Sequence, residues 1–343
     1  NLAEVYYTQG RYADAEPLCK RSLAIWEKAL GPEHPGVATS LNNLAELYHD
    51  QGRYADAEPL LRRSLAIREK ALGPEHPGVA TSLNSLAALY HKQSRYADAE
   101  PLYKRSLAIR EKARGPEHPD VANSLNNLAV LYRDQGRTAD AEPLVRRSLA
   151  IRGKAFGFDH PDVATSLNNL AELYGAQGRY ADAEPLYKRS LAIREKTLGS
   201  DHPDVALNLN NLAVLYLVQR RYAEAEPLLR RLLAMFENAF GAEGPAMSTL
   251  RNILADVYRV QGRYAEAEPL YKRSLAISEK AFGPEHPNVA TSLNNLAALY
   301  ANQSRTADAE PLYERSLAIW EKALGLDHPD VATSLNNLAA LYA

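Results

Sequence analysis

The dipeptide Glu-Pro recurs every 42 residues along the whole chain, and this period constrains the fold more than any other feature of the sequence. Its eight copies begin at residues 16, 58, 100, 142, 184, 226, 268 and 310. No insertion or deletion disturbs the spacing, and no linker rich in proline, glycine or serine divides the chain. Self-similarity at a period of roughly 20 to 50 residues is typical of solenoids, in which each unit contacts only its neighbours. We therefore expect residues 1–343 to form a single elongated domain, cut within a repeat at both ends.

The sequence of each 42-residue unit predicts two amphipathic helices. The first covers about 36–50, where Leu41, Leu44, Ala45 and Tyr48 have the i, i+3, i+4, i+7 spacing of one buried helix face. It follows a His-Pro dipeptide, and proline suits the first position of a helix because it has no N–H to leave unpaired. The sequence Gln-Gly-Arg at 51–53 predicts a tight turn before the second helix.

The second helix covers about 54–72, and Gly73-Pro74 ends it. Pro59 lies inside this range, so we expect regular hydrogen bonding to begin close to Asp56. The mixed basic and acidic residues of this helix, as in KRSLAIREK at 104–112, indicate a solvated convex surface. One hairpin of this kind cannot bury its apolar faces alone and must stack on its neighbours. The sequence therefore predicts an all-α solenoid of about eight helix-turn-helix repeats.

Two adjacent asparagines stand in the middle of most first helices, in the sequence Leu-Asn-Asn-Leu-Ala. Asparagine costs a helix roughly 0.5 kcal/mol relative to alanine, so a compensating interaction is expected. The amide can bond the adjacent helix and fix the stacking, or it can bind the backbone of a peptide ligand. The second asparagine is replaced by Ser85 and Ile253, whereas the first is present in every unit. We therefore assign stacking to the second, and peptide binding to the first, which is Asn42, Asn84, Asn126, Asn168, Asn210, Asn252, Asn294 and Asn336.

The pattern NNLAELY..QGRYADAEPL resembles the tetratricopeptide repeat, whose usual period is about 34 residues. The 42-residue form, with AEPLCKRSLAI.EKALGPEHP.VATSLNNLA over 15–45, is similar to the repeat of kinesin light chains and their bacterial relatives. The resemblance covers the whole chain. It implies a right-handed superhelix whose first helices line a concave groove, where extended peptide segments of partner proteins bind.

Residues that share a face of the first helix with the first asparagine are candidates for ligand selectivity. At about 100° per residue, this face lies opposite the buried stripe. The candidates beside the asparagines are Glu46, His49, His91, Arg133, Val214 and Leu217. The face is polar in the first half of the chain and apolar over 207–218, where we expect hydrophobic side chains of a ligand to bind. Packing of these apolar residues on a neighbouring helix is the alternative.

Catalytic and metal-binding motifs are not found in the sequence. Seven of the nine histidines belong to the recurring His-Pro dipeptides, and stacked helices stand on the order of 10 Å apart, too far for these histidines to share a zinc ion. They are therefore interpreted as residues that start helices. No phosphate-binding glycine loop, paired-cysteine zinc spacing or HExxH motif occurs. We expect no enzymatic activity, no cofactor and no metal.

Charge and hydropathy argue against two classes of partner. With 40 basic and 42 acidic residues the chain is nearly neutral, unlike proteins that bind nucleic acid or acidic membranes. No apolar run approaches the roughly 20 residues that span a membrane. A single cysteine, Cys19, forms no internal disulfide and is interpreted as a small core residue, which fits a cytoplasmic location.

We therefore expect a protein-protein interaction scaffold that binds extended peptides of partner proteins. The alternative is the sensor or regulatory tail of a larger signalling NTPase or caspase-like protease. The ends of the array should leave apolar surface uncovered, including Leu335, Leu338 and Leu341, so end-to-end self-association is expected. One unit, 241–258, departs from the pattern at Gly244 and Arg251, which indicates a local bend or sequence drift.

Overall fold

A computed structural model describes residues 2–8 and 10–342, and in this part of the chain it contains seventeen α-helices and no strand. The first helices of the repeat are α1 (Leu2–Thr8), α3 (Pro35–Asp50), α5 (Pro77–Lys92), α7 (Pro119–Asp134), α9 (Pro161–Ala176), α11 (Pro203–Val218), α13 (Pro245–Val260), α15 (Pro287–Asn302) and α17 (Pro329–Leu341). The second helices are α2 (Tyr12–Leu30), α4 (Tyr54–Leu72), α6 (Tyr96–Arg114), α8 (Thr138–Phe156), α10 (Tyr180–Leu198), α12 (Tyr222–Phe240), α14 (Tyr264–Phe282) and α16 (Thr306–Leu324). The predicted all-α repeat fold is confirmed.

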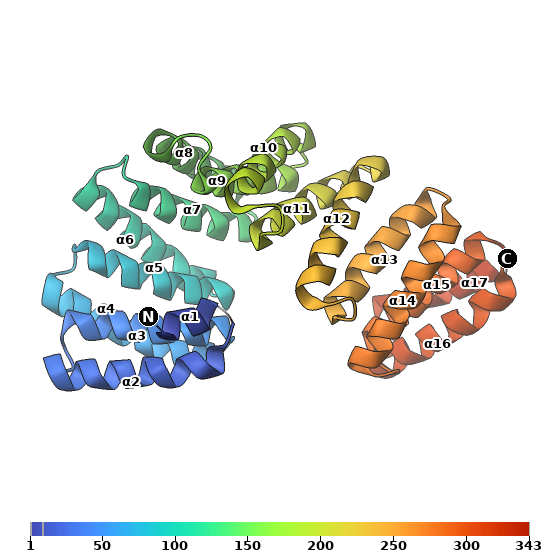
Figure 1. Ribbon diagram of the computed structural model, residues 1–343, viewed down its shortest axis with the longest axis horizontal. Helices are drawn as coiled ribbons and strands as arrows, with labels where there is room; N and C mark the ends of the chain where they lie inside the picture. The colour runs from blue at the N-terminus through green and yellow to red at the C-terminus, as the bar shows by residue number, and fades with distance from the viewer. Residues whose placement is uncertain (1, 9, 343) are drawn as a thin grey trace. The chain divides into compact units, whose positions relative to one another are not determined.

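The chain divides into two compact units, Asn1–Ile193 and Arg194–Ala343. Within each unit, consecutive helices pack on one another in chain order, α2 to α9 in the first and α11 to α17 in the second (Figure 1). The expectation of one continuous domain stays a prediction.

Histidine caps the start of the first helices. In seven of them the histidine before the proline is the N-cap, and its Nδ1 accepts a hydrogen bond from the backbone N–H two residues on. For His118 the acceptor distance to the Asp120 nitrogen is 3.1 Å. The interpretation of the loop histidines as helix starts is thus confirmed. In the divergent unit Gly244 takes this position and provides no side-chain cap.

The second helices begin where expected. Helix α4 starts at Tyr54, and its first backbone hydrogen bonds are donated by the nitrogens of Asp56 and Ala57 to the Arg53 carbonyl at 3.2 Å. Pro59 is accommodated as the sixth helical residue, because the carbonyl that it leaves without a donor belongs to the exposed Ala55, where water can bond it. At the other end Gly73 adopts φ +86°, a left-handed conformation that favours glycine and terminates the helix.

The core is a chain of similar clusters. Around α7, Val121, Ala122 and Leu125 are fully buried and pack on Ile151 of α8. Small residues let the helices approach closely, and the buried Ser148 donates a hydrogen bond from Oγ to the Ala122 carbonyl at 2.9 Å.

One expectation about the second helices is wrong in part. Arg68, Arg152 and Arg194 belong to the mixed-charge stretches yet are buried. Arg152 Nη1 donates to the carbonyl of Asp162 at 3.0 Å and to Ser166 Oγ at 2.8 Å. These stretches therefore turn one arginine toward the next first helix, and burial lowers the pKa of its guanidinium.

Candidate peptide-binding surface

The repeated asparagines bond one another across neighbouring first helices. Asn127 Nδ2 donates to Asn84 Oδ1 at 2.9 Å, and Asn169 Nδ2 donates to Asn126 Oδ1 at 2.7 Å. The same contact in the second unit joins α17 to α15 at 3.0 Å. In each pair the second asparagine of one repeat binds the first asparagine of the preceding repeat, 43 residues earlier. Both asparagines therefore take part in stacking, and the amide–amide bond offsets part of the cost of asparagine in a helix.

The first asparagines differ in their accessibility. The four buried ones are Asn42, Asn126, Asn168 and Asn252. The two partly buried ones are Asn84 and Asn294, and the two exposed ones are Asn210 and Asn336. The buried Oδ1 atom of Asn42 has no hydrogen-bond partner, because Ser85 replaces the asparagine that would donate to it. The role of these residues in binding peptide stays a prediction; the amides of Asn210 and Asn336 are the most exposed of the set.

A polar network joins three first helices in the first unit. His91 Nε2 lies 2.8 Å from Asp134 Oδ2, and Asp134 Oδ1 lies 2.9 Å from Arg133 Nη2. Arg133 also forms an ion pair with Glu172, whose Oε1 accepts a hydrogen bond from Asn168 Nδ2 at 2.8 Å. Glu172 was not among the candidates, although it stands three repeats after Glu46 and the period could have identified it. The network contains two carboxylates, one guanidinium and one imidazole, so it presents paired polar groups along α5, α7 and α9.

The other polar candidates lie on α3. His49 Nδ1 is 2.9 Å from Asp50 Oδ1, and its Nε2 is buried without a hydrogen-bond partner. Glu46 is exposed, yet neighbouring atoms desolvate its carboxyl, and this effect together with the charge of Asp50 raises its pKa. These side chains lie close together at the carboxyl end of one helix.

An apolar surface replaces these polar residues on α11. Leu207, Val214 and Val218 are 48%, 48% and 58% exposed, and Leu217 beside them is partly buried. Together with the exposed Asn210, the first three are called the α11 stripe. At equivalent positions α3 carries Thr39, Glu46 and Asp50. The polar α3 face thus contrasts with the apolar α11 face, and the binding of ligand side chains to the latter stays a prediction.

The divergent unit contains an ion pair between a buried arginine and a partly exposed glutamate. Arg251 is 5% exposed; it forms an ion pair with Glu237 of α12, and its Nη1 donates to the Ala242 carbonyl at 2.9 Å. Arg251 thus holds the loop between α12 and α13, and the departure from the repeat pattern is accommodated within the fold.

Two features of the described residues bear on other functions. In residues 2–8 and 10–342 no three histidine, cysteine, aspartate or glutamate side chains are grouped as a metal ion would need. No helix in the same ranges is both long and apolar enough to cross a membrane.

The stacked hairpins, capped alike and joined by the same asparagine and serine contacts, define an α-solenoid repeat protein. Comparison with known families identifies the type of repeat. Tetratricopeptide repeats match over 1–70, 40–112, 79–154, 157–238, 245–319 and 293–343. The chain therefore belongs to the tetratricopeptide repeat family, and arrays of this family are typical of protein-protein interaction scaffolds.

Solved structures of similar proteins agree with this assignment. A putative kinesin light chain from Podosopora anserina, with nearly identical repeats, is 31% identical over 60% of this chain and 98% of that chain, with a TM-score of 0.51. BtubC from P. vanneervenii is 23% identical over 68% of this chain and 92% of that chain, with a TM-score of 0.55. The apo quorum sensor NprR from B. thuringiensis is 14% identical over 93% of this chain and 85% of that chain, with a TM-score of 0.63. The last two likenesses concern the fold, and the first places this chain among kinesin light chain-like repeats.

Proposed function

We propose that this protein binds extended peptide segments of partner proteins along its first helices, and that the α11 stripe receives apolar side chains of the peptide. The α11 stripe carries this proposal. Leu207, Val214 and Val218 are about half exposed on a helix whose counterpart α3 is polar at the same positions. Apolar side chains that are exposed together on one helix face mark interaction surfaces.

The geometry of the stripe suits an extended ligand. Val214 and Val218 are one helical turn apart, about 6 Å along the helix axis. Side chains i and i+2 of an extended peptide are about 6.6 Å apart, so two apolar residues at alternate positions can contact both valines. No residue of the stripe is charged, which favours an uncharged apolar segment.

Asn210 lies on the same face and can bind the ligand backbone. It is exposed, and the position 43 residues later is Ile253, which has no amide to pair with it. A carboxamide donates and accepts at once, so it can bond a peptide group regardless of the peptide's side chains. The stripe thus combines apolar contact with one backbone-binding group.

A variant built from the chain's own residues tests the proposal. Leu207→Thr, Val214→Glu and Val218→Asp together give α11 the polar residues of α3, and because all three positions are half exposed the fold should persist. Phe240→Arg is the matched control, since it removes a 71% exposed apolar side chain from α12 and copies Arg114 at the equivalent position. The ligand is the tightest peptide selected from a random library on the 343-residue chain, and its affinity is measured by titration calorimetry.

The expected loss of affinity follows from the apolar area that the peptide would bury on the stripe. Full burial of such a side chain contributes about 1.5 to 3 kcal/mol, so burying three exposed halves gives roughly 3 kcal/mol, or about a hundredfold in affinity. We expect the triple variant to bind about a hundred times more weakly and the control to bind as the unmodified chain does. Equal affinity of the triple variant and the control would show that the peptide binds elsewhere.

The alternative function, that of a sensor or regulatory tail of a larger signalling NTPase or caspase-like protease, stays a prediction. A nucleotide-binding or protease segment encoded next to this chain would favour it.

A further inference from the structure

Arginine occupies one position of the second helix in all eight repeats, and in most of them it has two acceptors within the chain. Arg147 of α8 shows the arrangement. Its Nη1 donates to Glu111 Oε1 of the preceding second helix at 2.6 Å, and its Nη2 donates to the Pro116 carbonyl in the loop after that helix at 3.0 Å. A carboxylate and a loop carbonyl bond this arginine in five repeats, at Arg63, Arg105, Arg147, Arg231 and Arg315.

Arg189 of α10 lacks both acceptors. The residue 36 positions before it is Gly153, whereas the other seven repeats have glutamate there. Within residues 2–8 and 10–342 Arg189 forms no hydrogen bond or ion pair, and its guanidinium carbon lies 5.6 Å from the centre of the Phe158 ring. The side chain is exposed. The first unit therefore presents a positive charge with unused N–H donors to solvent.

Phe158 accounts for the missing glutamate. A Cβ added to Gly153 would lie 2.5 Å from Phe158 Cε1, too close for a side chain to be accommodated unless the ring moves. Phe158 is itself a departure, since four repeats have proline at this position of the loop. The glycine and the phenylalanine therefore depend on each other. Together they remove the carboxylate from Arg189 and place an aromatic side chain, 57% exposed, beside it.

We propose that Arg189, Phe158 and Phe156 bind a peptide segment of a partner protein in which an acidic residue adjoins an apolar one. These three residues are called the Arg189 surface. The peptide supplies the carboxylate and the backbone carbonyl that Arg147 receives within the chain. Its apolar side chain covers Phe158 and Phe156, which is 42% exposed at the end of α8.

A peptide suits this surface better than a phosphate ion does. In the five repeats described above the arginine bonds a carboxylate and a carbonyl, and a peptide carries both groups. The exposed aromatic rings also gain from an apolar partner that removes them from water, and a phosphate ion has no apolar group. Charge and apolar area together therefore favour a peptide with neighbouring acidic and apolar side chains.

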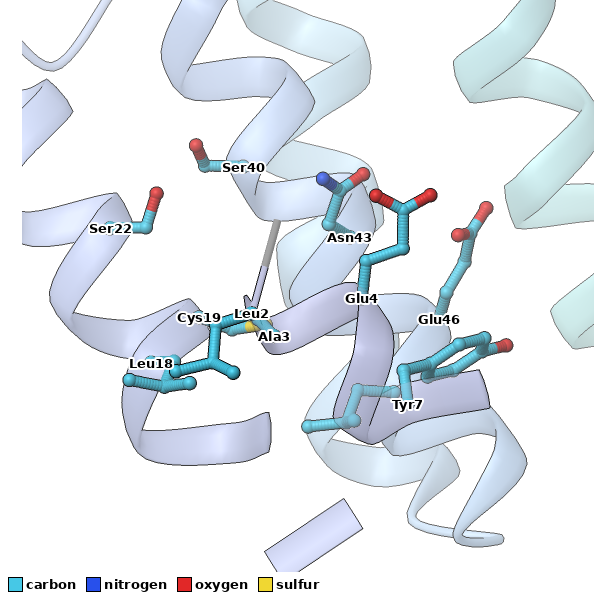
Figure 2. Close-up of a pocket in the computed structure, with 11 residues that line it drawn as sticks. Leu2, Ala3, Glu4, Tyr7, Leu18, Cys19, Ser22, Ser40, Asn43 and Glu46 are labelled. Atoms are coloured by element: carbon cyan, nitrogen blue, oxygen red, sulfur yellow. The ribbon is translucent and has the colours of Figure 1, made fainter. Parts of the chain in front are cut away.

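An acidic segment distinguishes this surface from two others. The α11 stripe has no charged residue, so it favours uncharged segments. A cavity of about 560 Å³ lies between α1, α2 and α3 (Figure 2), and Glu4 and Glu46 are among its lining residues. The described residues that line this cavity include no arginine or lysine, so they offer no countercharge to a carboxylate. An acidic probe therefore favours the Arg189 surface over both.

The repeat itself provides a variant that closes the surface. Gly153→Glu together with Phe158→Pro gives α8 and its loop the residues that α6 and its loop have at the same positions, Glu111 and Pro116. The new carboxylate should pair with Arg189 as Glu111 pairs with Arg147, so the fold should persist. The probe is a peptide selected from a random library on the unmodified 343-residue chain and depleted on this variant. Depletion removes peptides that bind the α11 stripe, because the variant retains that stripe.

The selected peptides should contain aspartate or glutamate next to an aromatic or aliphatic residue. Calorimetric titration should show about tenfold weaker binding to Arg189→Ala and at least as large a loss with the closed variant, because a hydrogen bond to a charged group contributes about one such factor. Arg147→Ala is the matched control; its arginine is paired with Glu111, so this variant should bind as the unmodified chain does. The proposal is overturned if no peptide survives depletion, or if the surviving peptides lack an acidic residue.

A double-mutant cycle locates the carboxylate of the peptide. Replacing the acidic residue of the peptide by its amide should weaken binding to the unmodified chain about tenfold and leave binding to Arg189→Ala unchanged. Equal losses with both chains would show that the carboxylate contacts another residue, and this result overturns the proposal. Inorganic phosphate that binds the unmodified chain more tightly than the peptide does, and that fails to bind Arg189→Ala, would assign the surface to a phosphate ligand instead and also overturn it.

Discussion

The hydrogen bond from Asn169 to Asn126 predicts a measurable coupling between two residues 43 positions apart. Replacing Asn169 by alanine removes the donor and leaves Asn126 Oδ1, on a side chain that is 9% exposed, without its partner. An unpaired buried acceptor costs about 1 to 3 kcal/mol, while alanine gains about 0.5 kcal/mol of helix propensity. We expect Asn169→Ala to lower the free energy of unfolding by about 1 kcal/mol.

The double variant isolates the bond itself. When Asn126 and Asn169 are both replaced by alanine, neither partner of this bond is left unpaired. The loss of unfolding free energy should therefore be smaller than the sum of the two single losses. The difference, a coupling energy of about 1 kcal/mol, is the contribution of the amide–amide bond. Asn210→Ala is the matched control, since Ile253 faces it in the repeat, and it should stabilise the chain by up to about 0.5 kcal/mol.

Urea denaturation followed by circular dichroism measures these differences. Because long repeat arrays can depart from two-state unfolding, native-state hydrogen exchange of α7 and α9 provides the local free energy. A coupling energy below about 0.3 kcal/mol, or an Asn210→Ala variant as destabilised as Asn169→Ala, would refute the role of this bond in stacking.

Three further perturbations test other contacts. His118→Ala removes a helix cap and should cost about 1 kcal/mol by urea denaturation, most of which His118→Asn should restore; no loss would contradict the capping role. Arg152→Ala should cost about 2 kcal/mol, and Arg152→Phe, which copies Phe236 at the same repeat position, should cost less than half as much; a larger loss for phenylalanine would refute this. The hydrogen bond from Lys104 lowers the pKa of the Glu100 carboxyl. The stability that this carboxylate contributes is therefore present above pH 4.5 and is lost as the pH falls through the pKa of Glu100 in the folded chain. The urea midpoint should therefore fall from pH 5 to pH 3, and by less in Glu100→Gln; equal falls would show that this carboxyl does not contribute.

Local signals in the sequence predicted the helices well. The second helix was expected over 54–72, and α4 has these bounds because Gly73 and the Gln-Gly-Arg turn act within a few residues of the helix ends. The histidine caps were predictable for the same reason. Pro59 also allowed the start of regular hydrogen bonding near Asp56 to be predicted, because proline is tolerated only near the first turn of a helix.

Contacts between repeats were harder to predict. Helical periodicity places the two asparagines on different sides of a helix, but only the offset between stacked helices brings Asn169 against Asn126. The burial of Arg152 has a similar origin. It occurs in a sequence that is charged overall, and the next first helix covers it and supplies a carbonyl and a hydroxyl as acceptors. Such pairings depend on three-dimensional packing rather than on the period alone.

Binding of peptides along the first helices at the α11 stripe can be located by hydrogen exchange of the 343-residue chain, with and without its library-selected peptide. We expect slower exchange in α11 and its neighbour α13, whose Val260 is 50% exposed one repeat after Val218, and unchanged exchange in α12 around Phe240. Protection confined to the second helices, with α11 unchanged in the saturated complex, would contradict it.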